Sequence, residues 1–229
     1  MPVAVLDSLR VRARIVALDA RWAIRSSWRR ARGHHGACKT GEASARASHL
    51  TELWERTWPL ADPLGHELRV AYADRWVRFH SLPESKRYAD DASESGEILR
   101  RHRTVLAELR GSTGTADLWA IAPGWDWRDS NGGWAKDRLP GAWPWRIGQI
   151  DDDCPAYFWA ASGFSDSAVD ALLLEVADDR GRVLFGAPDL AWLYCPYDGG
   201  ADVLLPTVAE RDALKARHTD WLSTYPGGL

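Results

Sequence analysis

The strongest candidate for chemistry in this sequence is a set of four basic side chains, Arg78, His80, Lys86 and Arg87. Residues 76–82 are rich in aromatic and β-branched side chains, which predicts a strand. Since side chains alternate along a strand, Arg78 and His80 share one face, where they can hold a carboxylate or a phosphate. Lys86 and Arg87 follow in a turn before a helix, whose start offers unpaired backbone N–H groups. These residues therefore predict an anion-binding pocket.

The same stretch also fits an ordinary core unit with a solvated basic edge. Alternation puts His80 and Ser81 on opposite faces of the strand, so these neighbours do not form a nucleophile pair. The following segment, residues 95–109, has the apolar periodicity of a helix that faces the core, with His102 on the inward stripe.

A second candidate surface comes from tryptophan, of which the chain has 14. Residues 123–146 contain few signals for regular structure and are predicted to form a long loop. Loops of this length are usually functional or disordered, and the five tryptophans argue against disorder. Tryptophan is favoured at the centre of interfaces and on stacking platforms, although these rings equally fit a roof over the core. The interface candidates are Trp125, Trp127, Trp134, Trp143 and Trp145.

A third candidate is the tip of a predicted hairpin with strands at residues 190–194 and 201–205. Tyr197 and Asp198 occupy this tip, and the Asp-Gly-Gly sequence suits a tight turn. Either residue can contribute to a site, but Asp before Gly is also simple turn chemistry.

Two fragments contain metal-ligand residue types, namely Asp151–Asp153 and the run from His34 to Cys38. Neither has the spacing of a known metal site, and three adjacent aspartates on a turn are usually a solvated charge cluster. The sequence also lacks GxGxxG, Walker, GxSxG, HExxH and CxxC motifs. We therefore expect no metal and no cofactor.

Charge divides the chain at about residue 49. Residues 1–49 hold 10 Lys and Arg against 3 Asp and Glu, whereas residues 50–229 hold 19 against 29. The acidic part disfavours a nucleic-acid partner, because such binding depends on neutralising phosphates. The three widely spaced cysteines favour a reducing, cytoplasmic location, and no segment is apolar enough for a membrane span.

The predicted organisation is a basic N-terminal extension and linker over residues 1–49, weakly ordered, and a single domain over residues 50–229. For the domain we expect an α+β fold with an antiparallel or mixed sheet and helices mainly on one face. The strand at 117–122 is expected to pair with the strand at 76–81. Ser165 and Thr207 are predicted to cap the last two helices.

The runs RWVRFHSLPESKRYAD, ILRRHRTVLAEL and PDLAWLYCPYDGGADVLLP resemble a bacterial, actinobacterial family of domains of unknown function, number 3885. The resemblance covers roughly residues 50–229. The resemblance does not imply an activity, and it provides no catalytic residues to carry over to this chain.

Two functions are compatible with these observations. The first is a cytoplasmic, non-enzymatic protein-binding module of immunity-like or accessory type, since an acidic body and exposed indoles suit a basic protein partner. The second is an enzyme or small-ligand binder for an anionic substrate, with Arg78 and His80 orienting the ligand. The sequence leaves the oligomeric state open.

Overall fold

The computed structural model describes residues 41–113, 117–124, 133–151 and 154–223. The chain divides into two units, Met1–His35 and Gly36–Leu229, and everything below concerns the second unit. Its helices are α2 (Gly41–Thr57), α3 (Gly65–Ala71), α4 (Ala92–Thr113), α5 (Gly133–Arg138), α6 (Asp166–Ala177) and α7 (Val208–Arg217). Its strands are β1 (Trp76–His80), β2 (Trp119–Gly124), β3 (Trp143–Asp151), β4 (Cys154–Ser162), β5 (Leu184–Gly186), β6 (Leu193–Tyr197) and β7 (Gly200–Leu204).

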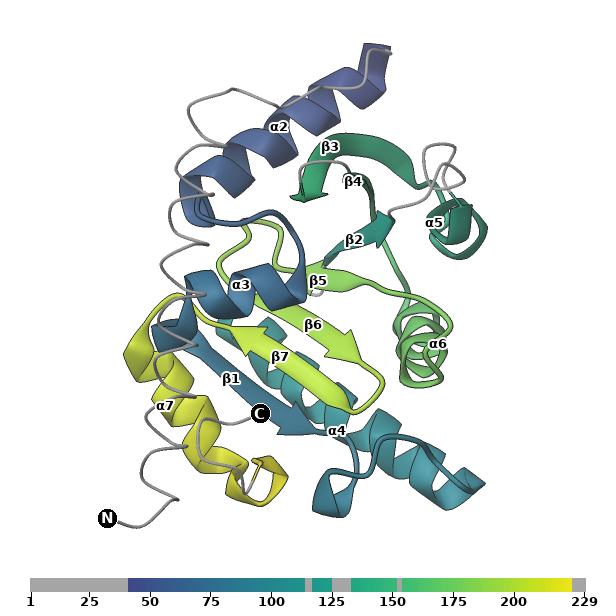
Figure 1. The fold of residues 1–229 in the computed structure, drawn as a ribbon, viewed down its shortest axis with the longest axis vertical. Coiled ribbons are helices and arrows are strands. Elements are labelled where there is room, and N and C mark those ends of the chain that lie inside the picture. The colour runs from purple at the N-terminus through teal and green to yellow at the C-terminus, as the bar shows by residue number, and fades with distance from the viewer. Residues whose placement is uncertain (1–40, 114–116, 125–132, 152–153, 224–229) are drawn as a thin grey trace, which may run out of the picture. The chain divides into compact units, whose positions relative to one another are not determined.

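The strands form one antiparallel sheet in the order β1-β7-β6-β5-β2-β4-β3 (Figure 1). The predicted pairing of strand 117–122 with strand 76–81 is wrong, because β1 pairs with β7 and β2 lies between β4 and β5. Gly200 allows the close approach of β1 and β7, since a Cβ there would lie 2.0 Å from the carbonyl oxygen of Phe79. The C-terminal hairpin therefore closes onto the first strand of the sheet.

Helices pack on both faces of the sheet. On one face, side chains of α4, α6 and α7 join Val77, Phe79 and Val203 in a large buried cluster. On the other face, α2 and α3 bury Trp54, Trp58 and their neighbours against the sheet. The expected α+β class and antiparallel sheet are confirmed, with α4, α6 and α7 on one face and the two N-terminal helices on the other.

Two segments are more regular than the sequence predicts. Residues 123–146 are not one long loop, because they include α5 and the first part of β3. Likewise α2 begins at Gly41, upstream of the predicted boundary at residue 50, and Ala47 is buried beside Leu50. Packing of small and aromatic side chains stabilises both segments, which sequence periodicity alone does not reveal.

The predicted caps are confirmed. Ser165 Oγ accepts a hydrogen bond from the Ala168 backbone N–H at 3.3 Å, and Thr207 Oγ1 accepts one from the Glu210 backbone N–H at 3.2 Å. Each cap satisfies a backbone donor that the first helical turn leaves unpaired. Within the described residues, no helix combines the length and the apolar character needed to cross a membrane.

A chain of polar side chains crosses the core between the sheet and α4. Ser81 Oγ lies 3.0 Å from His102 Nε2, and His102 Nδ1 lies 2.5 Å from Tyr194 Oη. All three residues are buried, and the cavity beside them has a volume of only about 10 Å³, enough for about one water molecule. The sequence predicted that Ser81 does not pair with His80, but it did not predict that Ser81 pairs with His102. With no room for a substrate, the chain Ser81–His102–Tyr194 is structural.

The histidine of this chain makes stability depend on pH. Burial lowers the pKa of His102 from 6.5 to about 4, so the folded protein keeps the imidazole neutral. The unfolded chain binds the proton more readily, and the contribution is therefore complete above about pH 6.5 and is lost as the pH falls toward 4. We expect this residue to cost about 3 kcal/mol of unfolding free energy over that range. Urea unfolding of the wild type and of His102→Gln, measured from pH 7.5 to 4, should show a shallower pH slope in the variant. Parallel slopes would contradict the assignment.

Candidate functional site

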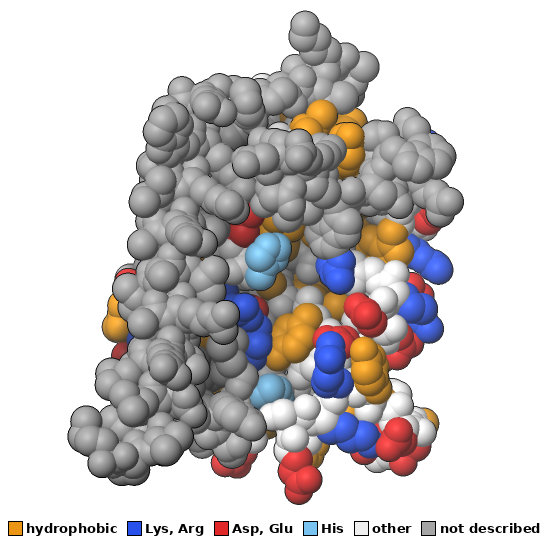
Figure 2. Space-filling view, viewed as in Figure 1, with side chains coloured by type: hydrophobic (Ala, Val, Ile, Leu, Met, Phe, Trp, Pro, Cys, Tyr) orange, Lys and Arg blue, Asp and Glu red, His pale blue; other side chains and the backbone are white. Residues whose placement is uncertain are grey.

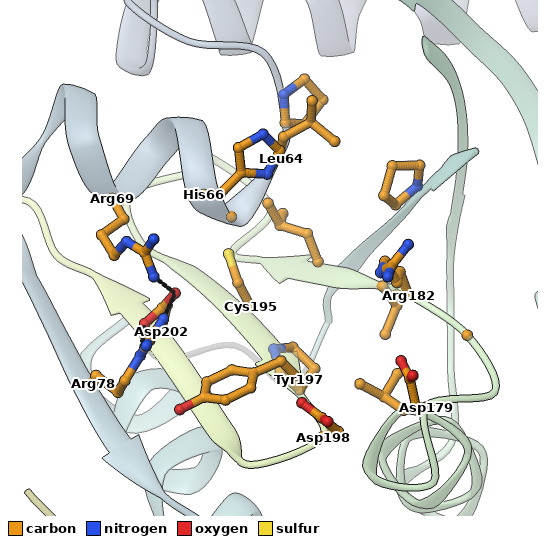
Figure 3. A pocket seen from close by; sticks show the side chains of 18 of the residues that line it. Leu64, His66, Arg69, Arg78, Asp179, Arg182, Cys195, Tyr197, Asp198 and Asp202 are labelled. Atoms are coloured by element: carbon orange, nitrogen blue, oxygen red, sulfur yellow. Dashed lines mark hydrogen bonds and ion pairs between the residues drawn. The ribbon is translucent and has the colours of Figure 1, made fainter. Parts of the chain in front are cut away.

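A pocket opens on the sheet face that carries α3, next to the connection between α6 and β5 (Figure 2). Its volume is about 490 Å³, within the range of roughly 300–1,000 Å³ that is usual for small-molecule sites. The start of α3, the face formed by β1, β6 and β7, and residues 179–184 line it. Figure 3 shows charged side chains converging on this space from all three sides.

One wall is fixed by a buried carboxylate. Asp202 on β7 accepts hydrogen bonds from Arg78 Nε at 2.8 Å and from Arg78 Nη2 at 2.9 Å. It accepts a third from Trp76 Nε1 at 2.8 Å. Arg78 and Asp202 face each other because they are register partners in the β1–β7 pair. This bidentate ion pair therefore orders the wall of the pocket and engages the guanidinium of Arg78.

Above this wall lie two basic side chains with fewer partners, Arg69 and His66. The Nη1 atom of Arg69, on α3, is 4.0 Å from Asp202 Oδ2, beyond hydrogen-bonding distance, and its guanidinium lies over the Trp76 ring. Neither the Arg69 side chain nor the His66 side chain forms a hydrogen bond with any of the described residues. Although His66 is exposed, partial burial lowers its pKa and the nearby Arg69 and Arg182 lower it further. This end of the pocket is therefore electropositive.

The opposite end carries carboxylates. Asp198, at the turn between β6 and β7, accepts hydrogen bonds from Arg87 Nη2 and from Tyr88 Oη, the latter at 2.8 Å. Asp179 lies in the connection after α6 and lines the same space. Tyr197 lies on the floor, and burial raises its pKa to about 12, so its phenol stays neutral.

The structure brings together only part of the predicted basic set. Arg78 and Arg87 line the pocket, with Tyr197 and Asp198 from the predicted hairpin tip. Lys86 does not, because its Nζ is held by Asp90 at 2.7 Å and by Glu94 at 2.6 Å. His80 borders a separate small cavity, and its buried Nε2 finds no partner among the described residues.

Several pocket residues were not predicted from the sequence. His66 and Arg69 belong to a short helix that the sequence left undecided, and Arg182 belongs to an irregular connection. Asp202 could have been identified from the sequence, because it lies among buried residues of its strand and a buried charge needs a partner. Identifying that partner required the β1–β7 register.

The three described tryptophans of the predicted interface set, Trp134, Trp143 and Trp145, pack in or against the core. Trp145 is fully buried and donates a hydrogen bond to Thr51 Oγ1 at 3.0 Å, and Trp143 is buried beside it. Trp134 is half-buried and packs on Gly181, where a Cβ would lie 2.2 Å from its ring. These three rings fit the alternative of a roof over the core. Trp125 and Trp127 lie outside the described residues.

The pocket has groups that bind but none that is set up as a nucleophile among the described residues. Cys195 lies on its floor, where burial raises the pKa of the thiol well above its usual value and keeps it protonated. Among the described residues no group of three His, Cys, Asp or Glu side chains gathers as a metal site. Asp152, Asp153 and the run from His34 to Cys38 lie outside the description.

The wall predicts a large stability effect at Arg78. Arg78→Ala leaves the buried carboxylate of Asp202 without its main partner, and we expect a loss of about 3 kcal/mol in unfolding free energy. Chemical denaturation of Arg78→Ala and of the double variant Arg78→Ala/Asp202→Ala tests this. The double variant should recover part of the loss, because the unpaired charge is gone. Equal stability of Arg78→Ala and the wild type would rule the role out.

Comparison with known proteins places the chain in a family. No curated protein and no solved structure matches it. The family described as "Domain of unknown function (DUF3885)" matches residues 64–226, a span that begins at Leu64 on the pocket wall and includes β1 to β7. The chain therefore belongs to this family of domains of unknown function (DUF3885).

Proposed function

We propose that this protein binds a small anionic ligand, with a carboxylate or phosphate group, in the pocket beside α3. The observation that carries the proposal is the position of Arg69. Its guanidinium faces the pocket next to a carboxylate that already accepts three hydrogen bonds, so its own donors stay available to a ligand. A planar guanidinium with free donors is suited to carboxylate and phosphate oxygens.

The local charge supports an anion. Four arginines line the pocket against three aspartates, whereas residues 50–229 as a whole hold 19 Lys and Arg against 29 Asp and Glu. A positive recess on a negative body concentrates an anion where the cations are and disfavours it elsewhere. Apolar side chains, among them Leu64, Val183 and Leu184, also line the pocket, which suits a small organic acid.

Binding of a protein partner has less support from the described residues. That reading depended on exposed indoles, and the three described tryptophans of residues 123–146 pack against the core. We also favour binding over catalysis, because the thiol of Cys195 and the phenol of Tyr197 both stay protonated. The buried chain Ser81–His102–Tyr194 has no room for a substrate.

Calorimetry tests the proposal. Titration of the full chain with phosphate, succinate and citrate at constant ionic strength should detect binding, and Arg69→Gln should weaken it about tenfold or more. Arg217→Gln is the matched control, because Arg217 pairs with Glu108 on another surface and does not line the pocket. If no anion binds, or if the two variants lose affinity equally, the proposal fails.

Binding should also depend on pH through His66. Its pKa is lowered in the free protein by partial burial and by Arg69 and Arg182, and a bound anion raises it again. After correction for protonation of the ligand itself, affinity should therefore increase as the pH falls from about 8 toward 5.5, the range in which an imidazole takes up a proton. His66→Asn should give a flatter profile in the same titrations. An unchanged profile would show that His66 does not contact the ligand.

A further inference from the structure

Asp179 is an unusual residue for its place in the fold. It follows the last turn of α6 with a φ of 54°, in the left-handed region where glycine is the common choice at the end of a helix. An aspartate adopts this conformation less readily than glycine. A charged residue kept at a strained position beside a pocket is a reason to ask what the charge does.

The carboxylate of Asp179 also differs from the other two aspartates of the pocket. Asp202 is paired with Arg78 and Trp76, and Asp198 is paired with Arg87 and Tyr88. The Asp179 side chain is exposed and makes no hydrogen bond or close ion pair with the described residues, and only the longer-range field of its charge reaches Arg87 and Tyr88. Its charge is therefore available to a group that enters the pocket.

Asp179 and Arg69 lie on opposite sides of the same space. Figure 3 shows Arg69 on the side formed by α3 and Asp179 on the side formed by the connection after α6, with the floor between them. One side thus offers a guanidinium without a hydrogen bond to the described residues, with His66 near it, and the other offers a carboxylate without a hydrogen-bond donor among the described residues. Val183 and Leu184 also line this space, and their apolar side chains suit a short hydrocarbon segment.

We propose that the ligand is a small zwitterion in which a few methylene groups separate a carboxylate from a primary ammonium. The carboxylate binds at Arg69 and His66, and the ammonium binds at Asp179. This inference rests on the proposed function, since it names the class of anion that the pocket selects. It also explains the aspartate at a glycine-like position, because glycine would fit the backbone and lose the ammonium site.

Matched ligand pairs test this assignment. The full chain is titrated by calorimetry with ω-amino acids of three to six carbons and with the unsubstituted fatty acids of the same lengths. For the best length, the amino group should increase affinity by about tenfold, as expected for a charge-assisted hydrogen bond. In Asp179→Asn the two members of each pair should bind alike, while the affinity for the fatty acid stays near that of the wild type.

Asp178→Asn is the matched control, since Asp178 neighbours Asp179 in the chain but pairs with Arg180 and does not line the pocket. Thermal unfolding should show that both variants fold, and Asp179→Gly should unfold at a higher temperature than the wild type. If the members of each pair bind wild type equally, or if Asp179→Asn keeps the preference, the zwitterion is overturned and anion binding stands. If neither series binds and phosphate, succinate and citrate also fail, both proposals fall.

Discussion

The site depends on one buried carboxylate. Asp202 lies in the interior of β7 with 4% of its surface exposed, so its charge is tolerable only because Arg78 and Trp76 supply three hydrogen bonds. Those donors come from β1, whose antiparallel register places Arg78 opposite Asp202 and Trp76 opposite Leu204. The requirement to satisfy this group fixes the edge strand, orients the wall of the pocket and leaves Arg69 without a hydrogen-bond acceptor among the described residues, 4.0 Å from Asp202.

This arrangement gives the two faces of the sheet different roles. The face under α4, α6 and α7 is apolar apart from the buried chain Ser81–His102–Tyr194, and it supplies most of the packing. The other face is apolar under α2 and α3 but is charged beside the start of α3. The pocket lies at that change, because the sheet there carries side chains that α2 and α3 do not cover.

Local sequence patterns predicted the helices and strands better than they predicted which strands and side chains pair with each other. Alternation placed Arg78 and His80 on one face of β1, and the caps at Ser165 and Thr207 follow from hydroxyls before helical runs. The site required information that no local pattern contains. Arg78 and Asp202 are 124 residues apart in the sequence. Because strand order places them together, Arg78 pairs with this carboxylate and not with a ligand. His66 and Arg69 lie on a helix of seven residues, too short for periodicity to reveal.

The pairing of β1 with β7 also constrains the order of events during synthesis. Trp76 pairs with Leu204 and His80 with Gly200, so the edge strand must wait for the final hairpin before its hydrogen bonds can form. Contacts so distant in sequence form slowly, because a long loop has to close first. The nascent chain therefore carries the Arg78 guanidinium without its partner until nearly all of the domain has been translated, and the recess beside α3 first exists in the finished protein.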